Sequence, residues 1–203
     1  MTPRPRKVSD EDVFAAAFRA MTRLGPAELT LAEIADEAGV TAGALVQRFG
    51  SKRQLQLALA EGAAEFAGDF IRGLRAKHKS PLAAIRDYAD CMAHLAESPA
   101  ALARNLAYLQ TDISDPDFRK HLLVQSKATR SGMIELLQDA VDARELRKGT
   151  DVAKLARIIE TVLSGGLITW GIYREGSAER WLRDHVETVL APHLMPKRRG
   201  SRQ

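Results

Sequence analysis

The chain of 203 residues is 45% hydrophobic and 28% charged, which is typical of a globular protein and excludes a disordered or fibrous chain. Its formal net charge of +4 permits binding to nucleic acid without indicating it strongly. A single cysteine, Cys91, excludes an intrachain disulfide framework. No secretory signal and no uncharged apolar run of roughly 18 residues is visible, so we expect a cytoplasmic protein without a membrane partner.

Apolar residues recur with helical spacing along almost the whole chain, and nothing indicates a strand. The first predicted helix starts near Ser9, where Asp12 completes a capping box, and Gly25-Pro26 ends it. The residues expected on its apolar face are Val13, Phe14, Ala17, Phe18, Met21 and Leu24. Before this helix stand Arg4, Arg6 and Lys7, which fit either an arm in the DNA minor groove or a solvated end.

Residues 30–52 predict two short helices, about 30–39 and 42–48, followed by the start of a third. Thr30 can cap the first helix, with Glu33 placed for a capping box, and Gly39 stands where a helix end favours a left-handed residue. Thr41 is the N-cap candidate for the second helix. Two helices joined by a short turn containing Gly form a helix-turn-helix, whose second helix enters the DNA major groove. The alternative is an ordinary helical corner.

Longer helices are predicted beyond this point. The helix from Lys52 to about Arg75 has an expected buried stripe of Leu55, Leu59, Phe66, Phe70 and Leu74. The helices that follow are expected at about 82–96, 100–110, 117–146, 151–175 and 177–191, with a turn at 112–116. The sequence therefore predicts an all-α fold of about nine helices.

The pattern within residues 9–55 resembles the DNA-binding domain of TetR-family transcriptional regulators. The residues that carry the resemblance are Thr30, Ile34-Ala35, Ala38-Gly39-Val40-Thr41, Gly43, Leu45, Phe49 and Ser51-Lys52. The remainder resembles the family in architecture, with a long helix pair that contains Leu163-Ser164-Gly165-Gly166-Leu167 and Trp170. The resemblance implies a helix-turn-helix DNA-binding domain at 1–53, a ligand-binding and dimerisation domain at 54–195, and a basic disordered tail at 196–203.

The resemblance also implies roles in DNA binding for individual residues. Thr30 and Lys52 would contact phosphates from the starts of their helices, in agreement with the affinity of helix N-termini for phosphate. Thr41, Ala42 and Gly43 would begin the recognition helix. Near the base edges or the DNA backbone would lie Gln47 and Arg48, side chains that pair with adenine and guanine. Two positions depart from the family, because a polar residue is usual at Ala44 and a tyrosine at Val46, where the valine could contact a thymine methyl.

Several aromatic and polar side chains are candidates for a ligand cavity between the later helices, and the alternative for each is core packing. These candidates are Cys91, His94, Tyr108, Gln110, Trp170 and Tyr173. Asp87, Cys91 and His94 also share one helical face and could bind zinc if a further ligand joined them. An accidental trio is the more common case, so no metal is expected.

The last two predicted helices carry apolar residues that fit either packing within the chain or a two-fold interface with a second copy. A dimer is favoured because two DNA half-sites require a two-fold protein. The residues expected at the interface are Leu155, Ile159, Val162, Gly166, Trp181, Val186, Val189 and Leu190. Gly165-Gly166 costs about 1 kcal/mol per glycine within a helix, which indicates close approach of another helix or a ligand, or a kink.

We therefore expect a homodimeric repressor that a small-molecule ligand releases from a palindromic operator on double-stranded DNA. The alternative is an architectural helical protein that binds DNA without sequence preference or a ligand response. No nucleophile elbow, phosphate-binding glycine loop or zinc-protease motif occurs in the sequence. An enzyme is therefore not expected, and neither is a cofactor.

Overall fold

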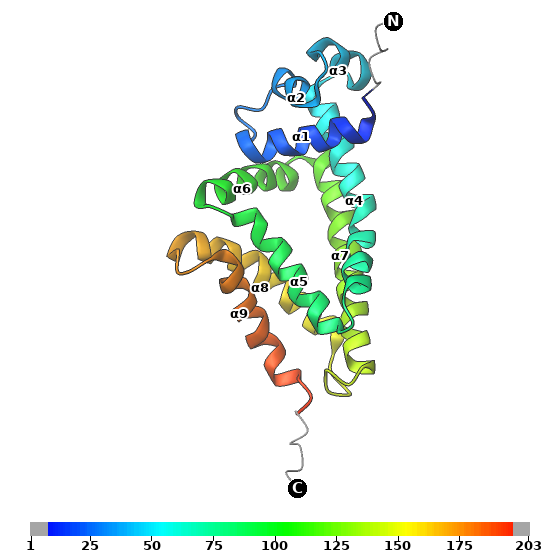
Figure 1. Cartoon of the computed structure of the whole chain (residues 1–203), viewed down its shortest axis with the longest axis vertical. Helices are drawn as coiled ribbons and strands as arrows, with labels where there is room; N and C mark the ends of the chain where they lie inside the picture. The colour runs from blue at the N-terminus through cyan, green and yellow to red at the C-terminus, as the bar shows by residue number, and fades with distance from the viewer. Residues whose placement is uncertain (1–7, 197–203) are drawn as a thin grey trace, which may run out of the picture. The chain divides into compact units, whose positions relative to one another are not determined.

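The computed structural model describes residues 8–196, and over this range the chain is all-helical, as predicted (Figure 1). Residues 8–196 contain nine α-helices and two 3₁₀ turns, and the only β-type contact within this range is an isolated bridge between Leu146 and Leu194. The helices are α1 (Asp10–Leu24), α2 (Leu31–Ala38), α3 (Ala42–Phe49), α4 (Lys52–Lys77), α5 (Pro81–Ala93), α6 (Pro99–Ser114), α7 (Pro116–Asp142), α8 (Val152–Tyr173) and α9 (Ala178–Leu190). The basic residues predicted to flank the fold, at 4–7 and 197–202, lie outside the described range.

The chain forms two compact units. Unit 1 contains the chain as far as Glu65 together with Ala103–Val124, and unit 2 contains Phe66–Leu102 and the chain from Gln125 onward. Helices α4 and α7 each begin in unit 1 and end in unit 2. Unit 1 therefore holds the predicted helix-turn-helix together with most of α6 and the beginning of α7.

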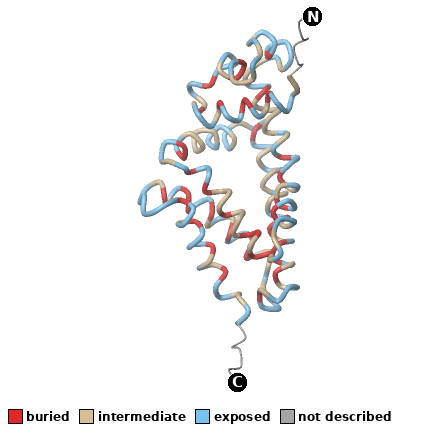
Figure 2. The backbone as a smooth tube through the Cα atoms, viewed as in Figure 1, coloured by how far each residue is buried: buried red, intermediate tan, exposed pale blue. Residues whose placement is uncertain are grey.

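The core of unit 1 is built from the inward faces of α1, α2, α3 and the first turns of α4. Its fully buried members are Val13, Ala17, Ala20, Leu29, Ile34, Ala35, Leu45 and Leu55. These residues recur three or four positions apart, so one face of each helix is buried and the opposite face is exposed (Figure 2). Phe18 was predicted on the buried face of α1 but is 64% exposed, because Ala16, Ala17 and Ala20 supply the contact surface there.

The ends of the helices in unit 1 follow local signals. Ser9 and Asp12 form the predicted capping box at the start of α1. Thr30 caps α2 by accepting a hydrogen bond from the Glu33 backbone N–H at 3.1 Å. The Glu33 side chain does not complete the predicted box at Thr30, since its carboxylate lies 3.2 Å from the Arg23 guanidinium.

In unit 2, helix α9 packs against both α5 and α8, and the second part of α4 lies against α7. Within α8, Gly166 lies close against α9, because a Cβ atom there would lie 2.6 Å from Leu182 Cδ2. Gly165 is exposed, and a Cβ atom on it would meet nothing within 4 Å. Close helix packing therefore accounts for Gly166 but not for its neighbour.

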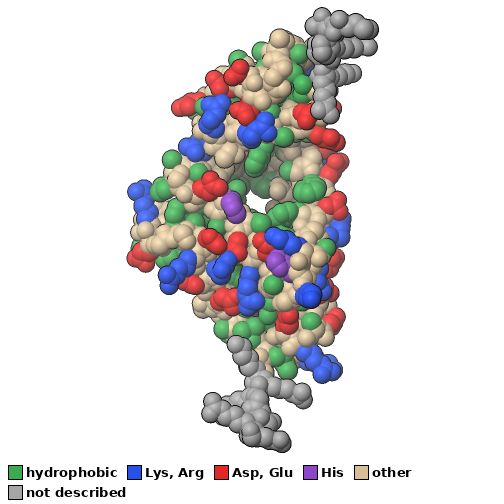
Figure 3. Space-filling model, viewed as in Figure 1, with side chains coloured by type: hydrophobic (Ala, Val, Ile, Leu, Met, Phe, Trp, Pro, Cys, Tyr) green, Lys and Arg blue, Asp and Glu red, His purple; other side chains and the backbone are tan. Residues whose placement is uncertain are grey.

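Ion pairs join α5 and α9 across the surface of unit 2. The Arg183 guanidinium pairs with the Asp90 carboxylate, and the Arg86 guanidinium pairs with Glu187. Basic and acidic side chains are accordingly interspersed on the face of unit 2 drawn in Figure 3. By length and composition α8 is also apolar enough to cross a membrane, a property that it shares with core helices of folded proteins.

Three predictions about the longer helices were wrong in detail. Helix α6 continues to Ser114 instead of ending near Gln110, because only Asp115 separates it from Pro116, which suits the first position of α7. Helix α7 ends at Asp142, and Arg144 beyond it has a left-handed backbone with φ of 60°. Phe66 is 61% exposed, since the buried stripe of α4 passes through Ala64, Ala67 and Ile71.

Candidate DNA-binding and ligand-binding sites

The turn between α2 and α3 has the backbone geometry of a helix-turn-helix. Gly39 ends α2 in the left-handed region, with φ of 68° and ψ of 31°, and Val40 N–H donates to the Ala35 carbonyl at 2.9 Å. Thr41 then caps α3, where its hydroxyl accepts a hydrogen bond from Ala44 N–H at 3.1 Å. Because the three residues 39–41 reverse the chain between two capped helices, α3 starts with its backbone N–H groups at the surface.

Helix α3 has one face in the core of unit 1 and one face outside it. Leu45 is buried, and the Phe49 ring lies 5.8 Å from the Phe14 ring, so both residues seat the helix as predicted. Val46 is 49% exposed. The other exposed members of the helix and its cap are Thr41, Gly43, Ala44, Gln47 and Arg48, while Ala42 is half-buried. These positions include the residues predicted to contact DNA from the recognition helix.

The two cations predicted to contact DNA have partners within unit 1. The Arg48 guanidinium pairs with the Asp10 carboxylate and donates a hydrogen bond to the Val8 carbonyl at 2.9 Å. Lys52 Nζ donates to the Leu29 carbonyl at 2.8 Å, next to the Thr30 cap. Arg48 therefore joins the start of α1 to α3, and Lys52 joins α4 to the α1–α2 turn.

The turn between α6 and α7 is held to the first turn of α4 by contacts that the sequence does not reveal. The Arg53 guanidinium lies 2.8 Å from carboxylate oxygens of both Asp115 and Asp117, and 5.5 Å from the centre of the Phe118 ring. On α6, Arg104 Nε donates to the Thr22 carbonyl at 2.8 Å. These contacts fasten both ends of the unit 1 part of α6 to the DNA-binding helices.

The six predicted ligand-binding residues are divided between the two units. Tyr108 and Gln110 belong to unit 1, and the other four belong to unit 2. Trp170 is buried and its indole N–H donates to the Gly176 carbonyl at 3.2 Å, whereas Tyr173 is exposed. His94 Nδ1 lies 3.0 Å from the Asp90 carbonyl, and burial raises the pKa of the Cys91 thiol.

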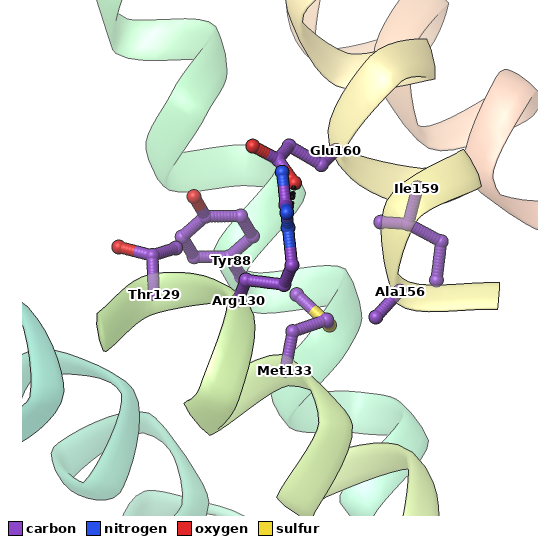
Figure 4. A pocket seen from close by; sticks show the side chains of 7 residues that line it. All are labelled: Tyr88, Thr129, Arg130, Met133, Ala156, Ile159 and Glu160. Carbon is purple, nitrogen blue, oxygen red and sulfur yellow. Dashed lines mark hydrogen bonds and ion pairs between the residues drawn. The ribbon is translucent and has the colours of Figure 1, made fainter. Parts of the chain in front are cut away.

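A small cavity of about 20 Å³ lies in unit 2 between α5, α7 and α8. Figure 4 shows the Arg130 and Glu160 side chains meeting across it beside the Tyr88 ring, and the ion pair between them measures 2.7 Å. Its remaining lining residues are Thr129, Met133, Ala156 and Ile159. This volume suits a water molecule, whereas drug-sized ligands occupy about 300–1,000 Å³.

A larger groove of about 420 Å³ lies between α4 and α7 in unit 2. Its lining includes the basic side chains Arg72 and Arg75, the acidic side chains Glu135 and Asp139, and His78. Arg75 Nε is bound to Asp139 Oδ2 at 2.6 Å, so part of this charge is compensated internally. None of the predicted ligand-binding residues lines this groove or the small cavity.

The α5 face that contains Asp87, Cys91 and His94, a candidate metal site in the sequence, carries a cluster of ion pairs at Asp87. Asp87 Oδ2 lies 2.7 Å from His78 Nε2 and 2.8 Å from Lys77 Nζ, and these hydrogen bonds lower the pKa of Asp87. Over residues 8–196 no group of three His, Cys, Asp or Glu side chains is placed to hold a metal ion. The Asp87 carboxylate instead ties the end of α4 to α5.

Comparison with known proteins agrees with this geometry. Residues 13–59 match the family of bacterial regulatory proteins described as the tetR family. A TetR transcription regulator from Haloarcula marismortui matches 92% of the chain over 98% of its own, with 18% identity and a TM-score of 0.72. SmeT, the repressor of the Stenotrophomonas maltophilia multidrug efflux pump SmeDEF, matches 94% of the chain over 93% of its own, with 21% identity and a TM-score of 0.64.

A third similar structure is the transcriptional regulator FadR from Bacillus subtilis in complex with stearoyl-CoA. It matches 90% of the chain over 98% of its own, with 17% identity and a TM-score of 0.65. A search of curated proteins found no sequence match. The capped helix-turn-helix within an all-helical chain defines a DNA-binding regulator. Within that class, residues 13–59 match the DNA-binding domain of the tetR family, and the fold is similar to that of TetR-family regulators.

Proposed function

We propose that the protein is a homodimeric repressor that binds a palindromic operator and leaves it when a small molecule binds to the helices beyond α3. The observation that carries the proposal is the exposed face of α3, which begins at the Thr41 cap and presents Val46, Gln47 and Arg48. A helix presented in this way fits the major groove and can read base edges. Thr30 and Lys52 at the starts of α2 and α4 would then contact phosphates.

Dimerisation is supported by an apolar face of α8 that no residue within 8–196 covers. Ile158, Ile168, Ile172 and Tyr173 are exposed large apolar side chains spaced along this helix. Five residues of the expected interface are instead buried within the single chain, namely Leu155, Ile159, Gly166, Val186 and Leu190. The proposed interface therefore combines the exposed face of α8 with the half-buried residues Val162, Trp181 and Val189.

The buried indole N–H of Trp181 supports the same proposal. It has no hydrogen-bond partner among the described residues, although the ring stacks 6.2 Å from Tyr173 and lies 4.9 Å from His185. A buried indole N–H usually has a partner. A carbonyl or carboxylate of a second copy would provide one.

Release by a ligand is supported by the fold and by what similar proteins bind. FadR of this fold was solved with stearoyl-CoA, and SmeT represses a multidrug efflux pump. A ligand can shift the protein from its operator only through different affinities for the two states. Here the fastened α6–α7 turn offers a connection between later helices and the DNA-binding helices, in addition to α4.

The proposal is tested by selecting binding sites from randomised DNA duplexes at near-physiological salt. We expect enrichment of a palindrome with half-sites one helical turn apart. Gln47→Ala should then weaken binding to that palindrome by about 10- to 100-fold, as expected for loss of a bidentate base contact of about 1–3 kcal/mol. Gln138→Ala, which makes the same chemical change on α7, is the matched control.

Enrichment of no sequence, together with equal and steeply salt-dependent affinity for all duplexes, would contradict the proposal and indicate an architectural DNA binder. Equal losses for Gln47→Ala and Gln138→Ala would contradict the assignment of α3 as the recognition helix.

A further inference from the structure

A carboxylate without a counter-ion lies half-buried on α6. No hydrogen bond or ion pair joins the Asp112 side chain to any other residue in the described part of the chain. Burial raises its pKa, whereas cationic partners lower the pKa of Asp87 and Asp115. Asp112 is thus a partly desolvated acid that has no compensating charge among the described residues.

A second unpartnered polar group lies one helical turn before Asp112. The Tyr108 hydroxyl oxygen is buried and makes no hydrogen bond to any described residue. The Tyr108 ring packs against the hydrophobic core of unit 1. Residues four apart on a helix are neighbours on one face, so the phenol and the carboxylate are adjacent.

On the other side of Asp112, α6 is apolar and exposed. Leu109 is 38% exposed and Ile113 is 57% exposed. At 100° per residue, Asp112 falls between Tyr108 and this apolar edge. Around the helix, the half-buried Tyr108 is therefore followed by the uncompensated Asp112 carboxylate and then by the exposed side chains of Leu109 and Ile113.

We propose that this face of α6 binds a lipophilic organic cation, in which a positive charge is carried on apolar groups. Asp112 would supply the countercharge, the half-buried Tyr108 ring would flank the cationic centre, and Leu109 and Ile113 would contact the apolar groups. A cation offsets the cost of the desolvated carboxylate, whereas an anion of the same shape increases it. That this cation is the effector rests on the proposed function, in which a small molecule releases the protein from DNA. Its chemical class, a lipophilic cation, is the new claim.

The position of Asp112 on α6 explains how a bound cation would affect α1 and α4. Arg104 and Asp115 occupy the same side of the helix as Tyr108, and they bind Thr22 of α1 and Arg53 of α4. A cation at Asp112 therefore binds between the two contacts that fasten α6 within unit 1. Its charge also lies three residues before Asp115, the partner of Arg53 in the α6–α7 turn.

The test uses two probes of matched size and opposite charge, tetraphenylphosphonium and tetraphenylborate, titrated into the full-length protein by isothermal calorimetry. We expect the phosphonium to bind and the borate to bind at least tenfold more weakly. Asp112→Asn should weaken phosphonium binding at least tenfold, and Asp112→Glu should retain most of it. Glu97→Gln, which removes one exposed carboxylate elsewhere, should leave phosphonium binding unchanged.

Equal binding of the two probes would overturn the proposal, as would equal phosphonium affinity for Asp112→Asn and wild type. The asparagine variant is expected to melt no lower than wild type, because it removes a desolvated charge, and this shows that a lost affinity is not lost folding. The calorimetry needs no operator, so it succeeds or fails independently of the repressor assignment. Phosphonium binding that leaves operator affinity unchanged would overturn the effector role alone.

Discussion

At the scale of single residues, Gly132 shows how tightly α7 packs against α4. A Cβ atom on Gly132 would lie 2.7 Å from Ile71 Cγ2 and 2.9 Å from Ile71 Cβ, and Ile71 is 2% exposed. Gly132→Ala should therefore lower the free energy of unfolding, because overpacking of about 1–3 kcal/mol outweighs a helix-propensity gain of about 1 kcal/mol. Chemical denaturation measures the difference.

The matched control for Gly132 is Gly73→Ala on α4, where a Cβ atom meets nothing within 4 Å. This substitution should stabilise the protein by about 0.5–1 kcal/mol. Equal effects of the two glycine substitutions would show that the helices separate without cost.

Tyr88 connects burial to stability at alkaline pH. Burial raises the pKa of Tyr88 to about 12, from 10.0 in the unfolded chain. Because the folded state holds the proton more tightly, the contribution to stability is complete below pH 10 and disappears as the pH rises toward 12. This group alone should cost about 2 kcal/mol between neutral pH and pH 12.

Denaturation measured from pH 8 to pH 12 tests this expectation with Tyr88→Phe, which should reduce the alkaline loss of stability. Tyr173→Phe, at a position that is 64% exposed, is the matched control. If both variants lost stability with the same pH dependence as wild type, ionisation of Tyr88 would not contribute to the transition.

At the scale of elements, Arg53 of α4 attaches the α6–α7 turn to the rest of unit 1. Arg53→Gln removes the pairs with Asp115 and Asp117 but keeps a long polar side chain. We expect faster amide hydrogen exchange in residues 111–118 and in the first turn of α4, because these segments lose their mutual attachment. The difference in exchange rate between Arg53→Gln and wild type should be smaller at high salt, because the ion pairs are exposed and salt screens them.

Arg119→Gln on α7 is the control for loss of one positive charge, because no ion pair of Arg119 is found among the described contacts. Exchange in residues 111–118 that is identical for Arg53→Gln and wild type would contradict a fastening role. In that case the packing of Tyr108 against the core of unit 1 would be sufficient to hold α6.

The elements also separate what the sequence could predict from what it could not. The limits of α2 and α3 were confirmed within a residue because their signals are local. The Thr30 and Thr41 hydroxyls each accept a hydrogen bond from the backbone N–H three residues further on, and Gly39 adopts the left-handed backbone that its position predicted. Arg53, by contrast, meets carboxylates 62 and 64 residues away. No spacing rule connects positions so far apart, so the attachment of α6 and α7 became visible only in three dimensions.

Assignment of residues to faces was less secure for long helices. In α8 apolar residues occur on all sides, so periodicity could not tell Leu155 and Ile159, which pack inside the chain, from Ile158 and Ile168, which face outward. The same ambiguity placed Phe66 in the core of α4. The predicted contacts of Gln47, Arg48 and Lys52 with DNA concern a partner that the chain alone does not contain, and they stay predictions.

At the scale of the whole molecule, dimerisation decides whether a recognition helix of eight residues can hold an operator. In the proposed repressor each α3 would read a single half-site, and dimerisation would make the second contact intramolecular, a gain of about 10²- to 10⁴-fold in affinity. Ile172, at 70% exposure, is the most exposed of the large apolar residues on the uncovered face of α8. A charge placed there should prevent the interface from forming, because it would be buried without a partner.

Ile172→Asp should therefore convert the protein from twice its chain mass of 22.3 kDa to that mass in light scattering, and weaken operator binding at least 100-fold. Leu123→Asp on α7, at a position 54% exposed, adds the same charge away from α8 and should stay dimeric. An Ile172→Asp protein that remains dimeric would place the interface elsewhere. A monomer that keeps its operator affinity would show instead that one recognition helix is sufficient, and the palindrome would lose its structural reason.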